Sequence, residues 1–327
     1  MKIFVTGGAG FIGSNFARMA IDNTLPGLED SDITVFDALT YSGTLTNLQD
    51  INDSDRFTFV HGDIRNAEDV AAALPGHDAI VHFAAESHVD RSVTDARVFV
   101  ETNVLGTQIL LDQALALKIP RFVHVSTDEV YGSIEEGSWD EAQPLLPNSP
   151  YSASKASSDL LVRSYHVTHG LNTSITRCSN NYGTHHFPEK LIPLFVTNLL
   201  DGHKVPLYGD GQNIRDWLHV DDHCRGIALV LTQGRAGEIY NIGGGTELSN
   251  AELTRALLEA TSRDESFIQP VADRLGHDRR YSVDIQKISS ELGYAPKVPF
   301  DEGLADVVQW YRDNRWWWEP LKERSGL

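Results

Sequence analysis

The chain has 327 residues, 41% of them hydrophobic, and a formal net charge of −19. This length and apolar content allow a large buried core, in one large or two interlocked domains, whereas the acidic balance disfavours nucleic acid and anionic membranes as partners. The only two cysteines, Cys178 and Cys224, exclude a disulfide scaffold and a zinc finger, and they favour a reducing compartment.

The amino-terminal stretch MKIFVTGGAGFIGS lacks the form of a secretory signal peptide, because glycines interrupt its apolar run. No window of the chain approaches the apolar length that a transmembrane helix requires. We therefore expect a soluble, cytoplasmic protein that has no membrane partner.

Short runs rich in Ile, Val and Phe alternate with helical patterns through the first half of the chain. The expected strands are residues 2–6, 33–37, 57–61, 79–83, 122–126 and 174–178, and the expected helices are residues 14–22, 67–74, 98–117 and 151–169. Such alternation is typical of crossover units that build a parallel sheet with helices on both faces. The sequence thus predicts a Rossmann-like, doubly wound α/β fold.

The sequence pattern changes after about Asn180, where the expected loops are longer and prolines are more frequent. Residues 216–231 suggest a strand and a helix that return to the sheet, 238–242 a further strand, and 250–260 and 301–314 the closing helices. We predict two interleaved lobes with a cleft between them. The Rossmann lobe takes residues 1–180 and is rejoined by 216–243, and a smaller α/β lobe takes 181–327, mainly 181–215 and 244–327.

Three glycines, Gly7, Gly10 and Gly13, form a GxxGxxG motif between the first strand and the first helix. Residues without a Cβ atom let backbone N–H groups approach a pyrophosphate, which the positive end of the helix also attracts. The same motif could be a tight turn that binds nothing. Its position between a strand and a helix favours a dinucleotide site.

Asp37 ends the second strand, 24 residues beyond Gly13. A carboxylate there can accept hydrogen bonds from adenosine ribose hydroxyls, and it would repel the additional phosphate of NADP. Residues 38–40 offer no cation to offset that repulsion, so NAD is favoured. The alternative is a carboxylate that only caps a turn. Asp63 and Ile64, at the end of the third strand, lie where an adenine edge could be met.

Tyr151 and Lys155 form a YxxxK pattern at the start of a long helix. Residues four apart share one helix face, so the ammonium group can lie near the phenol and lower its pKa. The pair follows Thr127, which ends a strand, by 24 residues. This arrangement indicates a tyrosine that serves as a general base.

Asp128 and Glu129 follow Thr127 directly, at the carboxyl edge of the sheet where open α/β folds bind their ligands. Two crowded carboxyl groups should titrate apart, one remaining protonated and one ionised. Such a pair could supply the acid and the base of an elimination. A solvated turn is the alternative.

The glycine motif, Ser126-Thr127 and the Tyr151/Lys155 pair resemble the extended short-chain dehydrogenase/reductase family. Within it, STDEVYG (126–132) resembles the signature of the dTDP-glucose 4,6-dehydratases, whereas simple epimerases of the family generally lack both carboxyls. Further matching blocks are HFAAESHVDRS (82–92), ETN (101–103), CSNNYG (178–183), FPEKLIP (187–193), PLYGDGQNIRDWLHVDDHCRG (206–226) and ADRLGHDRRY (272–281).

The resemblance implies NAD as cofactor, dTDP-glucose as substrate and dTDP-4-keto-6-deoxyglucose plus water as products. Tyr151 would take the proton of the sugar 4-hydroxyl as hydride passes to NAD, with Thr127 holding the oxygen. Glu129 would then remove the C5 proton, Asp128 would protonate the departing 6-hydroxyl, and the hydride would return to C6. The residues alone do not assign acid to Asp128 and base to Glu129.

The resemblance also implies the residues that bind each ligand. The implied NAD contacts are Phe11, Ile12, Asp37, Asp63, Ile64, Ala84, Ser87, Thr102, Tyr151, Lys155 and Asn181, together with the three glycines. The implied sugar-nucleotide contacts are Ser87, Thr127, Asn180, Lys190, Leu191, Pro206, Tyr208, Arg215, Asn250, Arg274 and His277. From chemistry alone, Arg215 suits a diphosphate or is a surface residue paired with Asp216, and Tyr208 suits a pyrimidine or core packing.

Other features carry weaker expectations. Thr184 and His185 stand where the family usually has Pro and Tyr, which loosens that loop. The thirteen histidines lack a ligand shell, so no metal is expected. Trp316, Trp317 and Trp318 follow the last expected helix and should pack against the smaller lobe. The helices at 98–117 and 151–169 would, by resemblance, form a homodimer interface.

Two other functions remain open on the same scaffold. One is a sugar-nucleotide epimerase or decarboxylase, against which Asp128 and Glu129 argue. The other is a regulator that binds NAD without catalysis.

Overall fold

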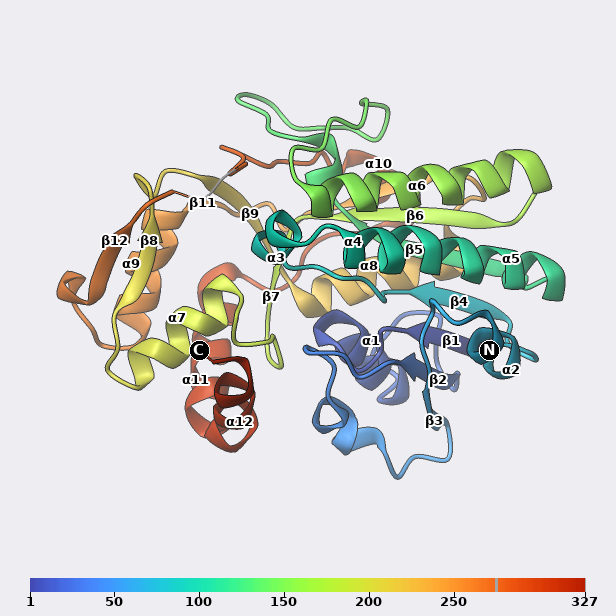
Figure 1. Cartoon of the computed structure of the whole chain (residues 1–327), viewed down its shortest axis with the longest axis horizontal. Helices are drawn as coiled ribbons and strands as arrows, with labels where there is room; N and C mark the ends of the chain where they lie inside the picture. Colours follow the sequence, from blue (N-terminus) through green and yellow to red (C-terminus); the bar gives the residue numbers. More distant parts are fainter. Residues whose placement is uncertain (274–275, 327) are drawn as a thin grey trace.

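Seven strands form the centre of the larger lobe in the computed structural model, which describes residues 1–273 and 276–326 (Figure 1). All their pairings are parallel, in the order β10-β6-β5-β4-β1-β2-β3. Every residue of β5 is buried, as expected for a parallel strand covered on both faces. The strands are β1 (Lys2–Thr6), β2 (Asp32–Asp37), β3 (Phe57–His61), β4 (Ala79–His82), β5 (Arg121–Thr127), β6 (Thr173–Cys178) and β10 (Ile239–Ile242).

Helices cover both faces of this sheet, and alternate strand residues pack against each layer. Val123 of β5 belongs to the apolar cluster with α1 and α8, whereas Phe122 belongs to the cluster with α2, α5 and α6. In Figure 1, α5 and α6 run side by side along one face. The helices are α1 (Phe11–Ile21), α2 (Ala67–Ala73), α3 (Val89–Thr94), α4 (Arg97–Phe99), α5 (Thr107–Leu117), α6 (Pro150–His169), α8 (Val220–Gln233) and α10 (Gln286–Leu292), with short turns η1 (Leu45–Ile51) and η3 (Asp128–Tyr131).

The smaller lobe contains a three-stranded sheet, β11-β9-β7, and a two-stranded sheet, β12-β8. Its apolar cluster includes Phe195, Leu253 and Trp318. Its elements are β7 (Asn180–Tyr182), α7 (Leu191–Leu200), β8 (Val205–Tyr208), β9 (Ile214–His219), β11 (Glu247–Ser249), α9 (Asn250–Ala260), η4 (Glu265–Phe267), β12 (Ile268–Val271), α11 (Phe300–Asp313) and α12 (Arg315–Ser325).

The predicted Rossmann-like fold is confirmed, and the expected strands agree with the observed ones to within one residue at either end. The return of the chain to the main sheet is more limited than expected. Helix α8 and strand β10 join the larger lobe, but β9 pairs with β7 and β11 in the small sheet. The resemblance implies that the larger lobe binds NAD and the smaller lobe binds the sugar nucleotide, and this division remains a prediction.

Two helical expectations were wrong. The expected helix at 98–117 contains a π-helical turn, η2 (Val100–Gly106), between α4 and α5. Within this turn the Asn103 side chain accepts from the N–H of Glu86 and donates to its carbonyl oxygen. The wider turn is therefore hydrogen-bonded to the loop after β4. The helix at 301–314 was expected to be the last, but the three tryptophans after it lie in a further helix, α12. The expected packing against the smaller lobe is confirmed for Trp317 and Trp318, whereas Trp316 is exposed.

Across residues 1–273 and 276–326, no helix combines the length and the hydropathy that crossing a bilayer would require.

Candidate active site

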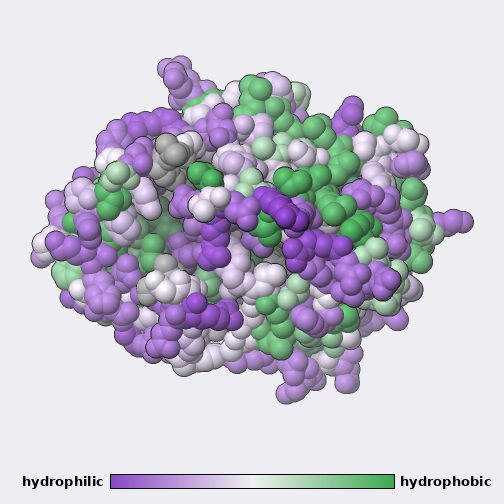
Figure 2. Space-filling view, in the orientation of Figure 1, coloured by the Kyte–Doolittle hydropathy of each residue, from purple (hydrophilic) through white to green (hydrophobic). Residues whose placement is uncertain are grey.

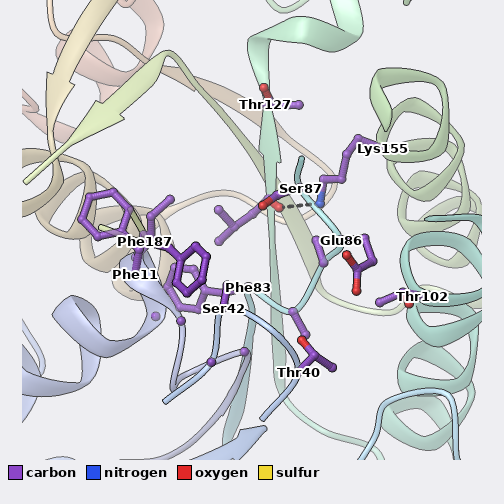
Figure 3. Close-up of a pocket in the computed structure, with 18 of the residues that line it drawn as sticks. Phe11, Thr40, Ser42, Phe83, Glu86, Ser87, Thr102, Thr127, Lys155 and Phe187 are labelled. Carbon is purple, nitrogen blue, oxygen red and sulfur yellow. Dashed lines mark hydrogen bonds between the residues drawn. The ribbon is translucent and has the colours of Figure 1, made fainter. Parts of the chain in front are cut away.

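A cavity of about 310 Å³ lies at the carboxyl edge of the main sheet. Its walls come from the loops after β1, β2, β3, β4 and β5, from η2 and α6, and from residues 178–190. Figure 3 shows Phe11 and Phe187 on one side of it and Lys155 and Thr102 on the other. Ligands of doubly wound sheets bind at this edge.

The glycine loop is shaped to receive an anion. Gly7 has a φ of +69°, and a Cβ atom there would lie 2.5 Å from the backbone nitrogen of Ala84. A Cβ atom on Gly13 would lie 2.4 Å from the Gly7 carbonyl oxygen. Helix α1 then begins after Gly10 with no side-chain cap and no acidic residue in its first turn. Its free N–H groups fit a dinucleotide's phosphates.

Asp37 both caps this region and lines the cavity. Its carboxylate accepts hydrogen bonds from the N–H groups of Ala9 (2.9 Å) and Leu39 (2.8 Å). Burial raises the pKa of Asp37, and the two N–H groups oppose that shift. The nearby Arg65 is paired with Asp63 at 2.6 Å. The residues present therefore fit the adenosine end of NAD.

Helix α6 places Tyr151 and Lys155 one turn apart on the cavity wall. The Ser149 hydroxyl caps the helix by accepting from the Ser152 N–H at 3.1 Å, and Pro150 occupies the first turn. The Lys155 ammonium donates to the Val125 carbonyl oxygen at 2.8 Å (Figure 3). Burial lowers the pKa of Lys155 to about 8, an effect that the Asp159 carboxylate opposes.

The expected lowering of the Tyr151 pKa is not found. Burial raises this pKa well above its ordinary value, and the charges of Glu129, Cys178 and Asp128 add to the shift. Lys155 directs its ammonium to a backbone carbonyl instead. The protein residues alone thus keep the Tyr151 phenol protonated.

Thr127, Asp128 and Glu129 turn into the cavity at the end of β5. The Thr127 hydroxyl accepts from the Glu129 N–H and donates to the Asp128 carboxyl, both at 3.3 Å. Asp128 is only 2% exposed. The solvated-turn alternative is therefore wrong.

The two carboxyl groups have different surroundings. Burial raises the pKa of Asp128 well above its ordinary value, and the charges of Glu129 and Asp216 reinforce the shift. Among the residues described, no hydrogen-bond partner lies near Asp128 Oδ2. Glu129 instead accepts a hydrogen bond from the Ser152 hydroxyl at 3.2 Å. This arrangement suits one protonated and one ionised carboxyl.

The cavity gathers most of the residues named from the sequence. It is lined by Gly7, Gly10, Phe11, Ile12, Gly13, Asp37, Asp63, Ile64, Ala84, Ser87, Thr102, Thr127, Asp128, Glu129, Tyr151, Lys155, Asn180, Asn181 and Lys190. Six of the named sugar-nucleotide contacts do not line it: Leu191, Pro206, Tyr208, Arg215, Asn250 and His277. Arg274 lies outside the described residues.

Several of these six lie in the smaller lobe around β8 and β9. The ring centroids of Tyr208 and His277 are 6.5 Å apart. Arg215 is only 5% exposed, its guanidinium lies 4.2 Å from the Tyr281 ring centroid, and it donates to the Asp278 carbonyl oxygen. The surface alternative for Arg215 is therefore wrong. The cavity at the sheet edge does not include this second group, and its contact with a sugar nucleotide stays a prediction.

Sequence reasoning missed other cavity residues. They lie in the loops after β2 and β4 and in the segment before α7, and they include Thr40, Tyr41, Ser42, Gly43, Phe83, Glu86, His186, Phe187 and Glu189. The Phe11 and His186 rings stack with centroids 4.0 Å apart, which joins the first helix to that segment. The matching block FPEKLIP already contained Phe187 and Glu189, and HFAAESHVDRS contained Phe83 and Glu86, although no role was assigned to these four residues.

Comparison with known proteins agrees with this geometry. A family model described as GDP-mannose 4,6 dehydratase matches residues 4–307. A dTDP-glucose 4,6-dehydratase of Streptomyces antibioticus is 62% identical over 327 residues, covering 100% of this chain and 97% of that protein. This chain belongs to the dTDP-glucose 4,6-dehydratase family. The resemblance seen in the sequence motifs is confirmed.

Solved structures place the dehydratase family within a broader fold. The crystal structure of DesIV, a dTDP-glucose 4,6-dehydratase from Streptomyces venezuelae with NAD and TYD bound, matches with a TM-score of 0.97 and 62% identity, covering 98% of this chain and 100% of that chain. A UDP-glucose 4-epimerase from Thermotoga maritima with UDP-glucose matches with a TM-score of 0.87 and 30% identity, covering 96% and 100%. The fold is thus shared with an enzyme named for another reaction.

The glycine loop gives a testable prediction. Gly7→Ala should abolish NAD binding and destabilise the protein, because its Cβ atom would overlap the backbone of Ala84. Gly245→Ala is the matched control, since Gly245 has a similar φ of +74° and no atom of the described residues lies within 4 Å of the added Cβ. The control should cost only the roughly 1–2 kcal/mol of left-handed backbone strain. Chemical denaturation and NAD titration measure both effects, and equal losses in the two variants would contradict the packing argument.

Proposed function

We propose that this chain converts dTDP-glucose to dTDP-4-keto-6-deoxyglucose and water, and that NAD serves as a cofactor regenerated in each turnover. The observation that carries this proposal is the buried, unpartnered carboxyl oxygen of Asp128 next to Glu129, in the same cavity as Tyr151 and Lys155. An oxidation alone needs only the tyrosine and the lysine. A dehydration also needs an acid and a base, and these two carboxyl groups can supply them.

The first step oxidises the sugar at C4. NAD, when bound, supplies the acceptor for the C4 hydrogen and a positive charge that favours a phenolate. Tyr151 takes the proton of the 4-hydroxyl, and Thr127 holds the same oxygen with its hydroxyl group. Lys155, whose pKa of about 8 leaves it largely protonated at neutral pH, adds a positive charge to the same cavity wall while its ammonium donates to the Val125 carbonyl oxygen.

The second step removes water across C5 and C6. The 4-ketone acidifies the C5 proton, which the Glu129 carboxylate removes. Asp128, kept protonated by its buried position, donates its proton to the departing 6-hydroxyl. Hydride return to C6 and protonation at C5 complete the product, so C4 is oxidised, C6 is reduced and one water is released.

The residues of the smaller lobe would hold the nucleotide. The planar guanidinium of Arg215 suits a diphosphate, and the Tyr208 ring suits a pyrimidine face. Ser87, Asn180 and Lys190 line the cavity where the sugar would lie. The Lys190 ammonium donates to the Ser87 carbonyl oxygen at 2.7 Å, which ties two of these segments together.

Isotope transfer separates this function from epimerisation on the same fold. Given dTDP-glucose carrying deuterium at C4, this enzyme should yield a product that carries the label at C6 and has lost one water. An epimerase would return the label to C4 without loss of water, and a non-catalytic NAD-binding protein would leave the substrate unchanged. Mass spectrometry and NMR of the product distinguish the three outcomes.

The carboxyl pair is tested by a variant that leaves oxidation possible. Asp128→Asn combined with Glu129→Gln should slow product formation by roughly 10²–10⁴-fold, because the acid and the base of the elimination are lost. Up to one equivalent of 4-keto sugar should accumulate per site in quenched samples analysed by mass spectrometry. Tyr151→Phe, as a comparison, should form neither intermediate nor product. A normal rate in the double variant would remove the assignment.

We also propose that the chain forms a homodimer through the helical face that contains α6. Figure 2 shows hydrophobic side chains gathered over this side of the larger lobe. Exposed apolar residues there include Val100 and Leu105 on η2 and Leu160 and Val167 on α6. Exposed apolar area of this kind is typical of a protein–protein interface.

Charge substitution tests the dimer. Leu160→Glu should shift the protein to monomer in sedimentation velocity, because the interface would have to bury a carboxylate. Leu146→Glu is the control, since Leu146 is as exposed as Leu160 (62% and 58%) but lies outside η2 and α6. A wild-type monomer, or equal behaviour of the two variants, would contradict this interface.

A further inference from the structure

Two buried side chains, Trp317 and Asn47, connect the carboxyl-terminal helix α12 to the glycine loop. Trp317 is 3% exposed, and its indole N–H donates to Asn47 Oδ1 at 2.9 Å. Asn47 lies in η1, and its Nδ2 group donates to the Ala9 carbonyl oxygen at 2.9 Å. Ala9 belongs to the loop between Gly7 and Gly10. The hydrogen bond between Trp317 and Asn47 therefore links two residues that are 270 positions apart in the sequence.

The orientation of the Asn47 amide follows from its partners. An indole N–H can only donate, so the amide oxygen faces Trp317 and the amide nitrogen is left to face the Ala9 carbonyl. The backbone carbonyl of Asn47 in turn accepts from the Arg18 guanidinium. Asn47 is almost fully buried, so losing any one partner would leave a buried polar group unpaired.

The Ala9 peptide is fixed from several sides. Its N–H donates to Asp37 at 2.9 Å, and its carbonyl oxygen accepts from the Thr44 N–H at 3.1 Å as well as from Asn47. These bonds hold the glycine loop against the strand that carries Asp37. The contact from α12 thus ends on the backbone that would cradle the pyrophosphate.

His185, one of the two residues that depart from the usual family pattern, completes this contact. Its Nδ1 atom lies 3.2 Å from the Arg18 guanidinium, and its ring centroid lies 4.4 Å from that of Trp310 and 5.5 Å from that of Trp317. Burial lowers the pKa of His185 to about 3, so its neutral ring can accept from Arg18. The altered loop therefore packs against the contact between Trp317 and Asn47, which we call the brace.

We propose that Trp317 and Asn47 are positioning residues that hold the glycine loop in its NAD-binding shape and slow the loss of NAD between turnovers. This inference rests on the proposed use of NAD. A loop already fixed in its bound conformation loses less conformational freedom when the ligand binds, so the complex is more stable. Slow release of NAD does not limit an enzyme that regenerates it in each turnover, because the catalytic cycle includes no exchange of the cofactor.

The first test removes only the indole N–H. In Trp317→Phe the ring and most of its packing remain, while Asn47 Oδ1 loses its donor. NAD release from the purified holoenzyme should become roughly three- to tenfold faster, as expected for the loss of a buried neutral hydrogen bond. Release is measured by exchange against isotopically labelled NAD, with no sugar substrate present.

The neighbouring tryptophan provides the matched control. Trp316 lies in the same helix, is 52% exposed, and donates to Asn314 at 3.1 Å rather than to the glycine loop. Trp316→Phe should leave NAD release unchanged. The second variant, Asn47→Leu, removes both ends of the link and should speed release at least as much as Trp317→Phe. Adding Trp317→Phe to Asn47→Leu should then have little further effect.

The outcomes distinguish three cases: an effect of Trp317 and Asn47 on NAD release, an effect on stability alone, and a failure of the proposed function. Thermal destabilisation of Trp317→Phe and Asn47→Leu with wild-type NAD release would overturn the brace while leaving the dehydratase reaction intact. Additive effects of the two substitutions would also contradict it. A wild-type protein that binds no NAD would instead overturn the proposed function itself.

Discussion

The carboxyl group of Asp128 lies in a buried position at the end of β5, with one oxygen unpaired and a second carboxylate beside it in the chain. An unpaired buried polar group costs about 1–3 kcal/mol, more if it is charged. The neutral acid avoids most of that cost, and for this reason the environment selects the protonated form. The same β5 terminus supplies the Thr127 hydroxyl, which donates to the Asp128 carboxyl and accepts from the Glu129 N–H. The end of β5 and the two carboxyl groups that we propose as acid and base therefore belong to one short segment.

The position of that segment depends on α6. An ion pair at 2.9 Å between Arg177 of β6 and Asp159 of α6 is buried. Arg177 also donates to the Tyr131 hydroxyl at 2.8 Å, and Tyr131 donates to Asn241 of β10. These bonds join the helix that carries Tyr151 to the turn that carries Glu129. A buried pair of this kind is weak support for stability, but breaking it leaves an uncompensated charge.

The fold does not choose the reaction. A dehydratase and an epimerase both match this chain along nearly its whole length, with TM-scores of 0.97 and 0.87. What distinguishes a dehydration is the pair of carboxyl groups, placed where an oxidised sugar would be held. The smaller lobe adds a group around Arg215 and Tyr208 that suits the nucleotide, and it braces the cofactor loop through Trp317.

The sequence by itself determined the sheet, the glycine loop and the two residue pairs that we propose to be catalytic. Buried parallel strands appear as continuous apolar runs, a strand-to-helix turn needs its glycines at fixed spacing, and Tyr151 and Lys155 share a helix face because they are four residues apart. Each of these signals is local in the chain. Only the tertiary structure decided that β9 joins the small sheet, that helix 98–117 contains a π turn, and that Trp317 reaches Asn47. It also decided that the Tyr151 pKa is raised, because burial and charge depend on contacts between residues distant in sequence, and no local spacing encodes them.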